Sequence, residues 1–110
     1  MAMATINPAT GETEFEAELH TAEEVEARLA KAQAAHEILR GMTYAERAKL
    51  MLAAADLIES EVEKTAVMLT KEMGKPIAQS RGEVLKCAKN MRFYAAKSEE
   101  FLAPQVLDDP

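Results

Sequence analysis

The alternation of apolar and polar residues near the N-terminus predicts a β-hairpin. Thr13, Phe15, Ala17 and Leu19 alternate with glutamates at the two-residue period of a strand. The Asn-Pro-Ala-Thr-Gly segment before them is rich in turn-forming residues. We therefore expect a hairpin over residues 4–19. Because a two-stranded hairpin is marginally stable alone, its apolar side should rest on another element.

Two capping-box sequences predict where helices begin. Thr21-Ala22-Glu23-Glu24 and Thr43-Tyr44-Ala45-Glu46 each place a threonine three residues before a glutamate. In this motif the threonine oxygen accepts from a free backbone N–H, and the glutamate side chain accepts from the N–H of the threonine. Helices should therefore start directly after residues 21 and 43.

After these caps, apolar residues recur every three or four positions, which is the period of an amphipathic helix. Gly41 and Gly74 favour helix ends, Pro76 suits the first turn of a third helix, and Pro104 stops it. The expected helices span residues 22–40, 44–73 and 76–103, with an irregular tail at 104–110. The fold class is mainly α with a short N-terminal hairpin.

Composition and charge narrow the possible partners and compartment. The chain of 110 residues has only 5% aromatic residues, a net charge of −6 and one cysteine. The negative charge disfavours nucleic acid and membrane surfaces as partners. A lone cysteine gives no internal disulfide, and no apolar run or leader segment suggests export, so the cytoplasm is the expected location.

Charge is unevenly distributed along the chain. Residues 1–40 contain three basic and eight acidic residues, whereas residues 75–110 contain six and five. The third helix carries a basic side formed by Lys86, Lys89, Arg92 and Lys97. Such a side suits a phosphate or an acid, but a solvated face, or weak pairing with the acidic first helix, is the favoured interpretation.

Cys87 is the only candidate thiol nucleophile. A catalytic cysteine needs a neighbouring base or a helix N-terminus to lower its pKa, and the sequence supplies neither near Cys87. It falls on the apolar stripe between Val84 and Met91. We therefore expect a small, buried core residue.

The two histidines are expected to be structural. His20 with Glu23 and Glu24 has the composition of a metal site, but the threonine between them fits a helix start with an acidic first turn better. His36 lies near the apolar stripe of the first helix and should be partly buried.

Carboxylates and glycines give no recognisable reaction site. Glu46, Glu72 and Glu83 have no carboxylate partner nearby in the sequence, and the glycines at 41, 74 and 82 are too scattered for a phosphate-binding loop. Gly82 within the third helix suggests close helix packing or a bend. We assign no catalytic, cofactor-binding or metal-binding residue in this segment.

Several short strings nevertheless resemble aldehyde dehydrogenases in their order and spacing. They are residues 4–12 (ATINPATGE), 44–48 (YAERA), 53–59 (AAADLIE), 70–76 (TKEMGKP), 82–88 (GEVLKCA), 92–95 (RFYA) and 100–103 (EFLA). The combination is most similar to bacterial NADP-dependent succinate-semialdehyde dehydrogenases. The resemblance covers nearly the whole chain.

The resemblance implies that the chain is the N-terminal fragment of a cofactor-binding domain, a piece of an α/β fold lacking its parallel sheet. In this family a cysteine thiolate attacks the aldehyde, NADP or NAD accepts hydride, and a glutamate activates water. None of those residues can be matched to this chain, because Cys87, Glu72 and Glu83 stand outside the corresponding motifs. The fragment should therefore be inactive and bind no cofactor.

Two hypotheses follow. In the first, the chain is cut from an oxidoreductase by truncation or proteolysis, its partner is the rest of that polypeptide, and its uncovered apolar faces drive homo-oligomerisation. In the second, it is an independent helical oligomerisation or interaction module without catalysis. The first predicts a gene of dehydrogenase length, and the second predicts a stop codon near residue 110.

Overall fold

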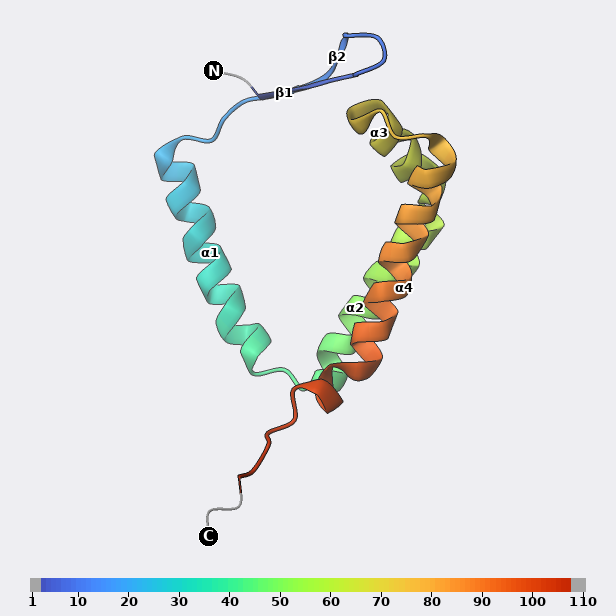
Figure 1. The fold of residues 1–110 in the computed structure, drawn as a ribbon. Coiled ribbons are helices and arrows are strands. Elements are labelled where there is room, and N and C mark those ends of the chain that lie inside the picture. The colour runs from blue at the N-terminus through green and yellow to red at the C-terminus, as the bar shows by residue number, and fades with distance from the viewer. Residues whose placement is uncertain (1–2, 108–110) are drawn as a thin grey trace.

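A computed structural model describes residues 3–107 as a hairpin and four helices (Figure 1). The strands are β1 (Met3–Ile6) and β2 (Thr13–Ala17), and the helices are α1 (Ala22–Arg40), α2 (Tyr44–Ser60), α3 (Val62–Met73) and α4 (Ile77–Phe101). The mainly helical fold with an N-terminal hairpin agrees with the sequence-based expectation. Within the described range no helix is both long and apolar enough to cross a membrane.

The hairpin is antiparallel, with Thr5 opposite Phe15 and an irregular register between Thr5 and Ile6. The Asn7 side chain organises the turn by accepting from the backbone N–H of Ala9 at 3.0 Å. Gly11 closes it at a φ of 76°, which is a left-handed conformation that glycine adopts without steric cost.

Both predicted capping boxes are present. Thr21 begins α1 and Thr43 begins α2, each accepting from the N–H three residues on while Glu24 or Glu46 accepts in return. The bounds of α1 match the predicted 22–40 helix. α4 starts at Ile77, with Pro76 just before its first helical residue.

The single helix predicted over residues 44–73 is wrong, because the chain bends at Glu61. The backbone of Glu61 lies at φ −103° and ψ 21°, which ends α2 and starts α3. The Ser60 hydroxyl donates to the Leu57 carbonyl at 2.8 Å, a local bond that often bends helices. The bend lets α3 pack against the first half of α4, while α2 packs along it.

The core is small and lies along the seam between α4 and its two neighbours. Its fully buried apolar residues are Ala55 of α2, Ala66 of α3, and Val84 and Ala88 of α4. Ser80 is also buried, and its hydroxyl lies 3.0 Å from that of Thr70 on α3. Small side chains in this seam let the helices approach closely.

α1 stands apart from the other helices (Figure 1). It joins α2 through Gly41, Met42 and Thr43, and all of its residues are exposed. The radius of gyration is 19.4 Å, compared with about 13 Å for a compact domain of this length. The chain therefore forms an open frame.

Candidate functional site

Cys87 is exposed on α4, so the prediction of a buried core residue is wrong. Its neighbours Val84 and Ala88 face α2 and α3, but Cys87 lies at the rim of that seam, beside a shallow hollow lined by Ile58 and Leu69. Among the described elements, α2 and α3 pack on α4, and they leave this side exposed. The buried part of the apolar stripe therefore includes Val84 and Ala88 but not the Cys87 thiol.

No cysteine–histidine pair exists in the described part of the chain. His20 lies just before α1 and His36 lies on α1, which stands apart from α4 (Figure 1). His36 is exposed, contrary to the partial burial predicted for it, because no element in residues 3–107 covers α1. Cys87 therefore has no imidazole base available from residues 3–107.

The cluster at His20 is a helix start, as predicted. Glu24 accepts from the backbone N–H of Thr21 at 2.7 Å, and this hydrogen bond holds the pKa of Glu24 below its usual value. The His20 Nδ1 atom lies 3.8 Å from the same carboxylate. Residues 3–107 contain no group of three or more histidine, cysteine or acidic side chains able to hold a metal ion.

The basic side of α4 pairs with α2 and not with α1, which corrects the predicted attraction between the first and third helices. Arg92 donates to Asp56 at 2.7 Å and to Glu59 at 2.6 Å. These two hydrogen bonds raise the pKa of Arg92. Lys97 binds Glu100 on its own helix at 2.7 Å, while Lys86 and Lys89 are solvent-exposed. The interpretation as a largely solvated face agrees with the structure.

Three further carboxylates, those of Glu46, Glu83 and Glu63, have identified partners and structural roles. Glu46 caps α2, and Glu83 forms an ion pair with Lys75. Glu63 receives two hydrogen bonds from Arg81, at 2.8 and 2.9 Å, which tie α3 to α4. Glu72 instead lines a hollow between the hairpin and α3, together with Glu14 and Lys71.

The hairpin docks on the corner between α3 and α4. Gly74 ends α3 at a φ of 67°, and a Cβ atom added there would lie 2.9 Å from Cγ of Pro8 in the hairpin turn. Lys71 donates to Glu14 at 2.9 Å, and Asn7 donates to the same residue at 2.9 Å. The expected support for the hairpin is thus the C-terminal end of α3.

The sequence predicted that the hairpin rests on another element but not that this element is the end of α3, although it contained a signal for each half of the contact. A glycine after a helix suggested a left-handed C-cap, and Asn7-Pro8 suggested a turn. Their meeting depends on tertiary structure. By contrast, the close packing suggested for Gly82 is wrong, since a Cβ atom there would meet nothing within 4 Å.

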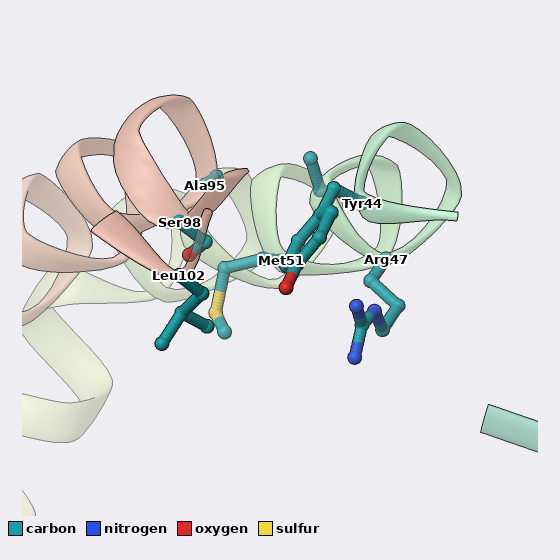
Figure 2. Close-up of a pocket in the computed structure, with 7 residues that line it drawn as sticks. Tyr44, Arg47, Met51, Ala95, Ser98 and Leu102 are labelled. Carbon is teal, nitrogen blue, oxygen red and sulfur yellow. The ribbon is translucent and has the colours of Figure 1, made fainter. Parts of the chain in front are cut away.

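A small apolar hollow of about 190 Å³ lies where the start of α2 meets the end of α4 (Figure 2). Met51 and Leu102 line it, and the Arg47 guanidinium lies 4.6 Å from the ring centre of Tyr44. This cation–π contact places a positive charge at the edge of the hollow. Its lining contains no carboxylate, histidine, lysine or cysteine side chain.

The most extensive feature is uncovered apolar surface. The chain exposes 9109 Å², whereas a compact protein of its mass would expose about 6000 Å². Large apolar side chains on α1, α2, α3 and α4 remain exposed. The described residues therefore offer docking surfaces more readily than a reaction centre.

The sequence model of the aldehyde dehydrogenase family matches residues 1–109. The chain belongs to the aldehyde dehydrogenase family. An aldehyde dehydrogenase relative, succinate-semialdehyde dehydrogenase (NADP(+)) 1 of Mycobacterium tuberculosis, is 44% identical over 108 residues, which cover 98% of this chain and 24% of the relative. This chain thus spans about a quarter of the relative's length.

Two solved structures match the arrangement of hairpin and helices described above. The structure described for cofactor and substrate selection by Gox0499 matches with a TM-score of 0.91 and 27% identity, over 100% of this chain and 25% of that one. Succinic semialdehyde dehydrogenase from Streptococcus pyogenes, in complex with NADP+, matches with a TM-score of 0.83 and 30% identity, over 96% and 24%. The separation of α1 from the other helices is therefore compatible with this family's fold.

Proposed function

We propose that this segment belongs to an enzyme that oxidises succinate semialdehyde to the acid, with NADP as the hydride acceptor. The supporting observation is the 44% identity to an NADP(+)-dependent succinate-semialdehyde dehydrogenase along 98% of the chain. The S. pyogenes structure bears a related name and holds NADP+. The substrate and cofactor of those proteins are the basis of the proposal.

The described residues do not fit a nicotinamide cofactor site of their own. Such sites cradle the pyrophosphate in a glycine-rich turn between a strand and a helix. Here Gly11 lies in the hairpin turn, Gly41 and Gly74 follow helices, and Gly82 lies inside α4. We therefore route no reaction step through these residues, and propose that the cofactor and the reacting groups are held by other parts of the enzyme.

In this proposal the chain is scaffold: it contributes helices and a hairpin to the cofactor-binding domain. The open frame supports this role, because its exposed apolar faces need cover and the same arrangement occurs in Gox0499, a chain four times as long. An independent helical module should instead bury its own core. Four small apolar residues are a weak core for 110 residues, which disfavours that alternative.

The test is the activity of the enzyme encoded by the complete reading frame that contains these residues. We expect NADP reduction with succinate semialdehyde, with a higher kcat/KM than for an aldehyde of equal length lacking the carboxylate, and higher with NADP than with NAD. The carboxylate-free aldehyde is the matched control for substrate choice. Absence of aldehyde-dependent reduction of either nicotinamide would refute the proposal.

A further inference from the structure

We draw no further inference here: the strongest candidate, the hollow between the hairpin and α3 that Thr5, Phe15 and Met68 line, is open on its outer side in a chain that spans about a quarter of its relatives' length, and nothing in the structure shows what covers it.

Discussion

Pro8 and Gly74 show how two residues far apart in the sequence fix one corner of the molecule. Gly74 supplies the left-handed turn that ends α3, and its missing side chain leaves room for the Pro8 ring. The two residues belong to two of the strings that resemble aldehyde dehydrogenases, residues 4–12 and 70–76. The contact therefore gives both strings a shared physical role, which is to seat the hairpin on α3.

Gly74→Ala should destabilise the chain by about 1–2 kcal/mol, because alanine resists the left-handed conformation and its Cβ would displace Pro8. Urea unfolding measures the loss, and hydrogen exchange should rise in the hairpin. Gly82→Ala is the matched control: its Cβ meets no atom, and alanine in an exposed helix should stabilise by up to about 1 kcal/mol. Equal effects from both changes would exclude the docking role.

Hydrogen-bonded carboxylates should make stability depend on pH. The pKa of Glu46 is lowered from its usual 4.5 chiefly by the backbone N–H of Thr43, and that of Glu63 chiefly by Arg81. A pKa lower in the folded state means stability that is present above 4.5 and lost as pH falls through the folded value. The urea midpoint should thus be flat near neutrality and fall below about pH 4.5.

Glu46→Gln is the informative variant for this pH dependence. It should lower the urea midpoint at neutral pH and make the acid decline shallower, because one stabilising ionised group is gone. Glu99 lies near the end of α4 as an exposed residue, and Glu99→Gln is the control. A midpoint that is independent of pH down to pH 3, roughly 1.5 units below the usual value, would contradict the assigned hydrogen bonds.

The sequence predicts the structural role of a residue when the interaction responsible lies within a few neighbouring residues. The caps at Thr21 and Thr43 were predictable, because each motif is complete within four residues. The exposure of Cys87 and His36 was not, because an apolar stripe indicates which side of a helix is apolar but not whether a partner covers it. Both errors have the same origin: among the described residues no element covers α1, and α2 and α3 leave the Cys87 side of α4 exposed.

At the level of elements, the bend at Glu61 is the main departure from the predicted helices. No glycine or proline marks it, and apolar spacing continues across it, so the sequence pattern indicated one helix. The bend allows both halves of the predicted 44–73 helix to pack on α4. α2 follows α4 along its length, and α3 turns to pack on its first half. A tertiary requirement therefore overrides a continuous local pattern.

The seam between α2 and α4 depends on small residues, so enlarging one should be costly. Ala88 is 1% exposed, and Ala88→Leu should destabilise by about 1–3 kcal/mol by forcing the helices apart. Ala96 lies exposed on the same helix, and Ala96→Leu should change stability by less than about 0.5 kcal/mol. Urea midpoints give both values. A harmless Ala88→Leu would mean that the seam is looser than the structure indicates.

At the scale of the molecule, the arrangement of the described helices leaves a large apolar surface uncovered. α1 stands away from the α2–α4 pair, as Figure 1 shows, and the only thiol has no histidine beside it in the described residues. The mainly helical class predicted from the sequence is confirmed, whereas the absence of catalytic, cofactor-binding and metal-binding residues from this segment stays a prediction. The sequence did not predict the open frame, because amphipathic patterns carry no information about how far apart helices lie.

The most direct measurement is nicotinamide reduction by the purified 110-residue chain supplied with succinate semialdehyde and NADP. The account predicts no reduction above the rate of buffer alone, and the same result for Cys87→Ser, because the chain supplies framework and the reacting groups lie elsewhere. Aldehyde-dependent reduction by the wild-type chain that disappears in Cys87→Ser would contradict the account, since the exposed thiol would then be a nucleophile.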